Sequence, residues 1–196
     1  MITYSNKNIY WNYFISIEDD LYRLSRFIEF DQRNESVFSI ELVRLLISSS
    51  SEFEVVSKEL CKMKTQGNRV KDIKTILLSS YPIISDLEIN ITRYGLKYKP
   101  LENWKMGNNC DWWASYNLVK HQRNSKYENA NLKNVLNSLG ALYIVNLYYY
   151  NALQEKIKNT TVSMEETTLE LKPRPCLIKV NHPDFYMIPY STAYNY

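Results

Sequence analysis

Residues 134–154 read NVLNSLGALYIVNLYYYNALQ, a run of 21 positions without one charged side chain. Apolar residues recur along the run at steps of three and four, which is typical of a helix. The near absence of charge predicts that this helix is buried around most of its circumference, at the centre of the fold. Several asparagines, a serine and a glycine make it a poor membrane-spanning helix, so we expect no membrane partner.

Three amphipathic segments precede the central run and are expected to pack on it as helices. Residues 8–30 and 36–65 each carry an apolar stripe with helical spacing. The four serines at 48–51 are interpreted as part of the second helix, which continues through them. A shorter helix is predicted for residues 70–80, because Pro82 cannot continue it.

The period of the pattern changes between residues 86 and 101. Apolar and polar residues alternate on both sides of Gly95, which is typical of two strands joined by a tight turn. Two strands alone are barely stable, so this β-hairpin must lean on the helices. We therefore predict one helical bundle domain over residues 1–158, with a hairpin insertion at about 86–101.

The last part of the chain, residues 159–196, contains four prolines that exclude a long helix. Residues 177–180 are a candidate short strand within it. We expect the rest to form an extended C-terminal tail that packs on the bundle. The predicted fold class is therefore mainly α, with a small β-hairpin and this tail.

Composition narrows the functional classes. The chain has 196 residues, 45% of them apolar, which suffices for one domain with a substantial core. The net charge of +3 is compatible with nucleic acid but smaller than a dedicated basic face usually gives. Three cysteines without metal-binding spacing, and no secretory leader, favour a cytoplasmic protein. Glycine-rich nucleotide motifs and metal-binding motifs are absent, so we expect no cofactor and no metal.

The segment WWASYNLVKHQRN, residues 112–124, holds a polar cluster with one of the two histidines of the chain. On a helix it would present one continuous polar patch, formed by Asn117, Lys120, His121 and Arg123, with Tyr116 in the adjoining row. Histidine transfers protons readily at neutral pH, and lysine and arginine bind phosphate. This patch suits acid–base cleavage of RNA, with His121, Arg123 and Asn117 as catalytic residues, and Lys120 and Tyr116 as substrate-binding residues.

The same residues also have a structural interpretation, which the residue types alone favour. Lys120 and Arg123 would then belong to a solvated helix face, and His121 would be a buried histidine with a structural hydrogen bond. Glu52 is a further candidate substrate-binding residue. If the helix over residues 36–65 packs against the patch, Glu52 can face Lys120 or Arg123, since a buried glutamate needs such a partner. Glu52 can equally be an ordinary exposed residue.

Three stretches together resemble the HEPN-like helical proteins of bacteria and their phages. They are IEDDLYRLSRFIEF, SIELVRLLISSSSEFEVVSKELC and WWASYNLVKHQRNSKYENANLKNVLNSLGALYIV, within residues 8–155. The resemblance implies a helical bundle, frequent homodimers and often metal-independent ribonuclease activity in phage defence or toxin–antitoxin systems. Other members of that family only bind nucleotides or protein partners.

The chain departs from the nuclease motif of that family, in which a histidine follows an arginine by a few residues. Here His121 precedes Arg123, and the nearest earlier arginine is Arg93. Two functions therefore stay open. One is an RNA-acting protein, with or without ribonuclease activity. The other is a non-catalytic binding or adaptor protein of the same fold, with a protein partner.

Overall fold

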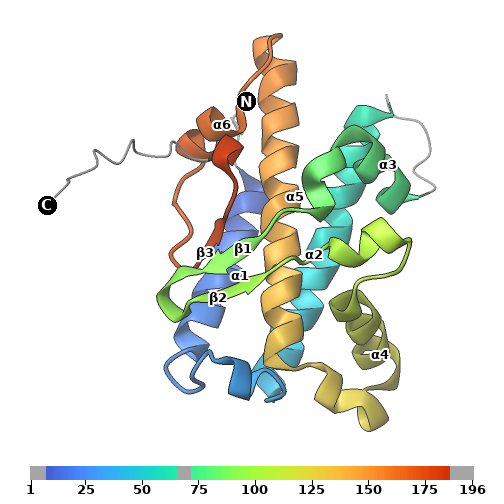
Figure 1. The fold of residues 1–196 in the computed structure, drawn as a ribbon, viewed down its shortest axis with the longest axis vertical. Coiled ribbons are helices and arrows are strands. Elements are labelled where there is room, and N and C mark those ends of the chain that lie inside the picture. Colours follow the sequence, from blue (N-terminus) through green and yellow to red (C-terminus); the bar gives the residue numbers. More distant parts are fainter. Residues whose placement is uncertain (1–7, 66–71, 186–196) are drawn as a thin grey trace, which may run out of the picture.

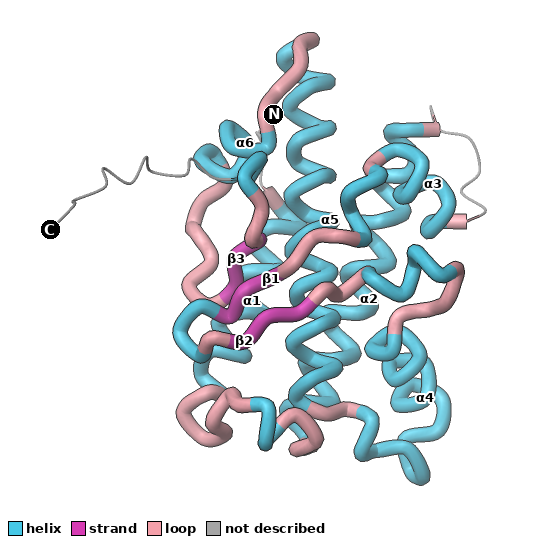
Figure 2. Tube along the Cα trace, viewed as in Figure 1, coloured by secondary structure: helices cyan, strands magenta, loops and turns pink. Residues whose placement is uncertain are grey.

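The computed structural model describes residues 8–65 and 72–185 (Figure 1). Within these ranges the chain forms six α-helices, several short 3₁₀ turns and one three-stranded antiparallel sheet. Figure 2 shows that strand is confined to one small region, and that helix makes up most of the rest. The prediction of a mainly α fold with a small hairpin is confirmed.

The central helix is α5, Leu132–Lys158, and it coincides with the charge-free run. Most of its side chains are buried, on all sides, because α1, α2, α4 and α6 surround it (Figure 1). Two buried asparagines of α5 donate hydrogen bonds within the protein: Asn146 to the Leu142 carbonyl at 3.0 Å and Asn151 to the Val162 carbonyl at 2.7 Å. In the described part of the chain, no helix combines the length and the apolar character needed to cross a membrane.

The longest neighbour of α5 is α2, Ile40–Lys64, which runs beside it. Its first turn is closed by Ser39, whose hydroxyl accepts a hydrogen bond from the Leu42 N–H at 3.2 Å. The serine run continues the helix, as predicted. The Ser49 and Ser138 hydroxyls are 2.6 Å apart and fully buried, so small polar residues join the two helices.

The first helix, α1, covers Ile9–Leu24 and is shorter than the predicted 8–30. The chain turns after Leu24 because Phe30 enters the core. This side chain is buried, with its ring 5.0 Å from the ring of Tyr94 in the hairpin. Local spacing indicated a longer helix, and the long-range contact of Phe30 ended it.

The sheet consists of β1, Ile89–Ile91, β2, Leu96–Tyr98, and β3, Ile178–Val180, in the order β2-β1-β3. The predicted hairpin forms around Gly95, whose φ of 67° lies in the left-handed region that favours glycine. The candidate strand near the C-terminus pairs with β1. The hairpin is therefore completed by a strand from the other end of the chain.

The remaining helices are α3, Ile73–Ser80, α4, Asp111–Lys126, and α6, Met164–Glu170. The short helix α6 lies in the segment that was expected to be extended, so that expectation is wrong for these residues. The prolines of residues 159–196 all come after α6 in the sequence, so they do not interrupt it. Ser163 caps the first turn of α6. The predicted helical positions 70 and 71, and the predicted extended end at 186–196, lie outside the described residues.

The C-terminal segment is held to α1 by a buried carboxylate. Glu18 is 1% exposed and accepts hydrogen bonds from three consecutive backbone N–H groups. Its Oε1 accepts from Leu177 at 2.8 Å and Ile178 at 2.9 Å, and its Oε2 accepts from Cys176 at 3.0 Å. Burial raises the pKa of Glu18, and the three N–H groups oppose this shift.

Candidate functional site

The helix that carries the predicted patch, α4, lies on one side of the bundle against α2 and α5 (Figure 1). The first turn is fixed by aromatic contacts. Trp112 is buried, and its indole N–H donates to the Pro100 carbonyl at 2.8 Å. Phe53 of α2 packs edge-on against Trp112, with ring centroids 5.1 Å apart. The tryptophans therefore anchor α4 to the core, as its sequence suggests.

Three of the predicted site residues lie together on α4. Asn117 donates to the Trp113 carbonyl at 2.9 Å. The Lys120 ammonium donates to the Tyr116 hydroxyl at 3.2 Å and lies 5.3 Å from the centre of its ring. Tyr116 is only 3% exposed, so the ring orients the lysine rather than offering a broad contact surface.

The other two residues predicted on α4, His121 and Arg123, are exposed at its far end. Among the described residues, neither makes a hydrogen bond or an ion pair. Gln122 between them has φ −135° and ψ 37°, which interrupts the helix, so the regular spacing assumed for the patch is not kept. The interpretation of His121 as a buried structural histidine is wrong. No described group orients its imidazole, as a preorganised general acid or base requires.

Glu52 is placed away from the patch. It lines a shallow hollow with Tyr10 and Tyr13 of α1, and burial raises its pKa. It forms no ion pair with Lys120 or Arg123. Successive residues of a helix project about 100° apart, so Glu52 turns toward α1 when its neighbour Phe53 faces α4. Of the two alternatives left open for Glu52, the contact with Lys120 or Arg123 is therefore not the one that forms.

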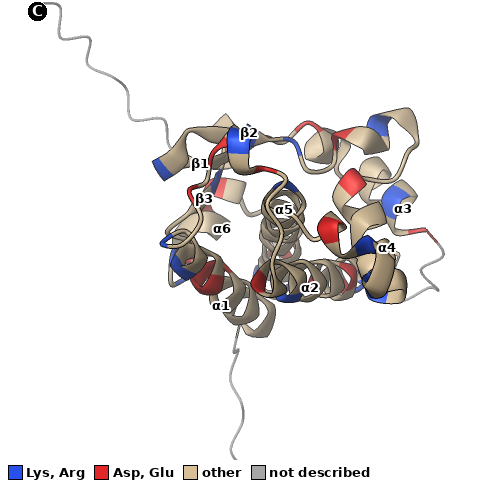
Figure 3. Ribbon diagram, turned by 90° about the horizontal axis from the view of Figure 1, so that it is seen from below, with Lys and Arg blue, Asp and Glu red and all other residues tan. Residues whose placement is uncertain are grey.

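The carboxyl-terminal half of α4 carries uncompensated positive charge. We define the cationic end of α4 as Lys120, His121, Arg123 and Lys126. No aspartate or glutamate occurs between Trp112 and Tyr127. None of the three permanent cations forms an ion pair with a described residue. Figure 3 shows basic positions of α4 at the edge of the molecule.

Two aromatic side chains adjoin this surface. Tyr127 directly follows Lys126, and its ring lies 5.8 Å from that of Phe38, nearly perpendicular to it. Phe38 is 51% exposed, although its backbone pairs with Asn131 at the start of α5. The exposed Phe38 ring is therefore linked to the cationic end of α4 through its contact with Tyr127. The sequence spacing of Phe38 and Tyr127 gave no sign of this contact.

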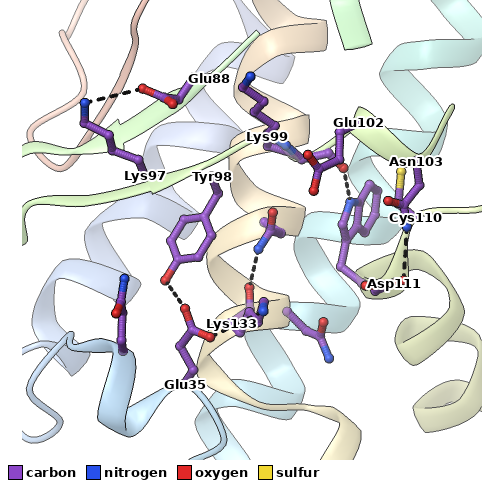
Figure 4. Close-up of a pocket in the computed structure, with 15 residues that line it drawn as sticks. Glu35, Glu88, Lys97, Tyr98, Lys99, Glu102, Asn103, Cys110, Asp111 and Lys133 are labelled. Carbon is purple, nitrogen blue, oxygen red and sulfur yellow. Dashed lines mark hydrogen bonds and ion pairs between the residues drawn. The ribbon is translucent and has the colours of Figure 1, made fainter. Parts of the chain in front are cut away.

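A hollow of about 630 Å³ lies beside the amino end of α4, between β2 and the start of α5 (Figure 4). Most of its ionic groups neutralise one another. Glu35 accepts from the Tyr98 hydroxyl at 2.9 Å and lies 3.4 Å from the Lys133 ammonium. Glu88 lies 3.7 Å from Lys97. Burial and the bond to Glu35 both raise the pKa of Tyr98, which therefore stays protonated.

The other residues that line this hollow indicate neither a charged ligand nor a reactive group. Lys99 and Glu102 have no side-chain partner among the described residues, and they contribute one charge of each sign. Burial raises the pKa of the Cys110 thiol to about 12, which makes it a poor nucleophile at neutral pH. The described ranges contain no His, Cys, Asp or Glu cluster that could hold a metal ion. The cationic end of α4 is thus the stronger candidate site.

Comparison with known proteins gives no match, whether to family models, to curated proteins or to solved structures. The resemblance to HEPN-like proteins therefore stays a prediction from the sequence. Among the described residues, the distribution of charge along α4 is the feature that indicates a type of ligand most clearly.

Proposed function

We propose that this protein binds single-stranded RNA at the cationic end of α4. The observation that carries the proposal is the set of three cations without internal ion pairs on an acid-free helix segment. Lysine and arginine without carboxylate partners are well suited to bind phosphates, because those that pair with carboxylates inside the protein are less available to a ligand. The net charge of the whole chain is small, so this concentration of charge is local.

The neighbouring rings favour a single strand over a duplex. Bases in a single strand are free to stack on exposed aromatic side chains, and those in a duplex are not. Phe38 supplies an exposed ring next to Tyr127 and Lys126. A strand whose phosphates contact Lys126 would bring a base within reach of this ring.

Ribonuclease activity is the second candidate, in keeping with the HEPN-like resemblance. Its supporting observation is that the His121 imidazole is exposed and adjacent in sequence to two phosphate-binding side chains. Acid–base cleavage uses two proton-transferring groups, and the described part of a single protomer has no second such group near His121. A homodimer that brings two cationic ends together around one strand would supply it, as the family resemblance implies.

The first test measures how the affinity for RNA depends on salt concentration. Fluorescence anisotropy of a labelled, unstructured oligonucleotide reports the binding. Three neutralised phosphates on a single strand predict a slope of about −2 for log affinity against log salt. The triple variant Lys120→Gln/Arg123→Gln/Lys126→Gln is expected to lose most of the affinity and most of the slope. A wild-type protein that does not bind RNA at low salt would refute the proposal.

The matched control removes the same charge elsewhere. Arg26, Lys156 and Lys179 are also exposed and without ion pairs to described residues. Their triple replacement by glutamine is expected to leave the affinity close to that of the wild type. Equal losses in both triple variants would show that binding follows net charge alone and not the cationic end of α4.

Cleavage is tested in the same samples. The wild type and His121→Ala are incubated with RNA without added metal, and the products are separated on a gel. Fragmentation by the wild type alone assigns the chemistry to His121 and favours the ribonuclease. Intact RNA, in samples where anisotropy shows binding and sedimentation has established the oligomeric state, favours the binding protein.

A further inference from the structure

A second hollow, of about 290 Å³, opens at the amino end of α4 and is walled by aromatic rings. Three of the four tryptophans of the chain line it, together with Phe53. The Phe53 ring is central: its centroid lies 6.2 Å from Trp104, 5.1 Å from Trp112 and 6.2 Å from Trp113. We call this hollow the tryptophan pocket.

Two indole N–H groups of the tryptophan pocket are unused. The Trp112 N–H is bonded to a backbone carbonyl, but those of Trp104 and Trp113 have no acceptor among the described residues. An indole in an enclosed position usually finds an acceptor, and Trp104 is only 8% exposed. The residues that line the pocket therefore combine aromatic rings with two indole N–H groups that have no acceptor in the described part of the chain.

The charged side chains around the tryptophan pocket are already engaged. Glu54 is paired with Lys58, and Lys74 donates to a backbone carbonyl. Asp72 caps α3 by accepting from the Thr75 N–H and hydroxyl. The lining thus contains two acids and two bases, each with a partner inside the protein. An uncharged planar group with acceptor atoms fits this lining better than an ion does.

Side-chain contacts along α4 link the tryptophan pocket to the cationic end of α4. The Trp113 ring lies 5.2 Å from that of Tyr116, and the Tyr116 hydroxyl holds the Lys120 ammonium at 3.2 Å. Lys120 follows Trp113 by seven residues, which on an α-helix is about 10 Å along the axis and nearly on the same face. A ligand in the pocket can therefore extend along α4 to Lys120.

We infer that the tryptophan pocket holds one unpaired nucleobase of a bound RNA strand, whose phosphates then run along α4 to Lys120. This inference rests on the proposed function and deepens it, because it assigns a base-binding subsite to the same helix. Bases present flat π-faces and ring acceptors, which match the indole faces and the two free N–H donors. A volume near the lower end of small-ligand pockets is large enough for one base.

The first experiment uses tryptophan fluorescence, since three of the four tryptophans line the pocket. Adenosine and AMP are each titrated into the full-length protein, with ribose 5-phosphate as the probe that lacks a base. Both base-containing probes are expected to quench the emission saturably, and ribose 5-phosphate is not. Equal effects of all three probes, or no saturable quenching by adenosine and AMP, would overturn the base pocket.

The second experiment separates the pocket from the proposed function. Trp113→Leu is expected to weaken RNA binding about tenfold, the effect of one lost base stack, without changing the salt slope. Trp113→Phe keeps an aromatic face and is expected to recover part of this loss. The control is Phe27→Leu, which removes a ring that is 84% exposed and remote from α4, and leaves the affinity unchanged.

The outcomes are distinct. RNA binding that depends on the cationic end of α4 but is unaffected in both Trp113 variants refutes the pocket and keeps the proposed function. Quenching by adenosine without any RNA binding refutes the proposed function and restricts the pocket to free nucleosides and nucleotides. Circular dichroism melting of each Trp113 variant establishes that a lost affinity does not reflect unfolding, and Trp113→Phe serves if the leucine variant does not fold.

Discussion

Replacement of Glu18 is expected to loosen the C-terminal segment from α1. In Glu18→Ala the N–H groups of Leu177 and Ile178 remain buried without an acceptor. Each buried donor left without a partner costs about 1–3 kcal/mol, so the two together cost about 2–6 kcal/mol. The N–H of Cys176 is only partly buried, and water can reach it. This loss is a large share of the about 5–15 kcal/mol by which a domain of this kind is stable.

Glu18→Gln is the matched variant, because the two buried N–H groups share one oxygen. Oε1 accepts from both Leu177 and Ile178, and an amide oxygen in its place keeps both bonds. The amide NH₂ would replace Oε2, which accepts from Cys176. Only this outer bond and the negative charge are lost, so we expect a cost of about 1–2 kcal/mol, smaller than for alanine.

The pH dependence of the two proteins gives a further test. Burial raises the pKa of Glu18 in the folded protein above the ordinary 4.5. In the interval between the two values the folded state binds more protons than the unfolded state, so the wild type loses stability as pH rises. Glu18→Gln has no such group. The advantage of the wild type over Glu18→Gln should therefore be largest at low pH and shrink toward neutral pH.

Urea unfolding followed by circular dichroism, at several pH values from about 4 to about 7, measures all three proteins. The expected order of unfolding free energy is wild type, then Glu18→Gln, then Glu18→Ala. An alanine variant as stable as the wild type would refute the role of Glu18 as the anchor of residues 176–178. An advantage over glutamine that grows with pH would refute the raised pKa.

Three shorter predictions concern the core and α4. Gly140→Ala places a Cβ against the Ile89 side chain, which must then move within a packed core, and we expect a loss of about 1–3 kcal/mol in urea unfolding. Ser138→Ala removes the buried partner of Ser49, which still donates to a backbone carbonyl, so a smaller loss of about 0.5–1.5 kcal/mol is expected in the same assay. His121→Ala is expected to change stability by less than about 0.5 kcal/mol in thermal melts, because the imidazole is exposed and unbonded to described residues.

The elements with strong local patterns were predictable. The charge-free run became α5, the serine run stayed helical, and the alternation around Gly95 became the hairpin. In each case the spacing of the apolar residues is characteristic of a helix or a strand, so the local sequence is enough to identify the element. Where the outcome depended on distant contacts, the prediction failed: Phe30 ended α1 early, and α6 formed inside the predicted extended tail.

The candidate site was predictable in part. The sequence pointed to α4, and the structure brings Tyr116, Asn117 and Lys120 together there. It could not reveal the break at Gln122, which separates His121 from Arg123, because neither glycine nor proline marks it. The turn of Glu52 toward α1 depends on which face of α2 meets α4. The tryptophan pocket likewise joins residues from separate segments, which no local spacing records.

The stability of the helix explains only part of the charge distribution on α4. Cations in the last turn interact favourably with the helix dipole, which accounts for Arg123 and Lys126. The dipole equally favours acids in the first turn, yet only Asp111 is acidic there. Exposed helices are commonly stabilised by pairs such as Glu54–Lys58 on α2, and α4 has none. A helix segment without acids between Trp112 and Tyr127 favours the binding of a polyanion.

Stability and RNA binding are therefore expected to respond oppositely to one substitution on α4. Asn117→Glu places a carboxylate one turn before Lys120, where such pairs add about 0.2–0.5 kcal/mol to a helix, and glutamate also has the higher helix propensity. The same carboxylate would repel phosphates from α4. We therefore expect a melting temperature at or above that of the wild type, together with weaker RNA binding. Asn117→Gln, neutral and of similar size, should bind as the wild type does. If Asn117→Glu also binds RNA with wild-type affinity, the ligand does not lie on this face of α4.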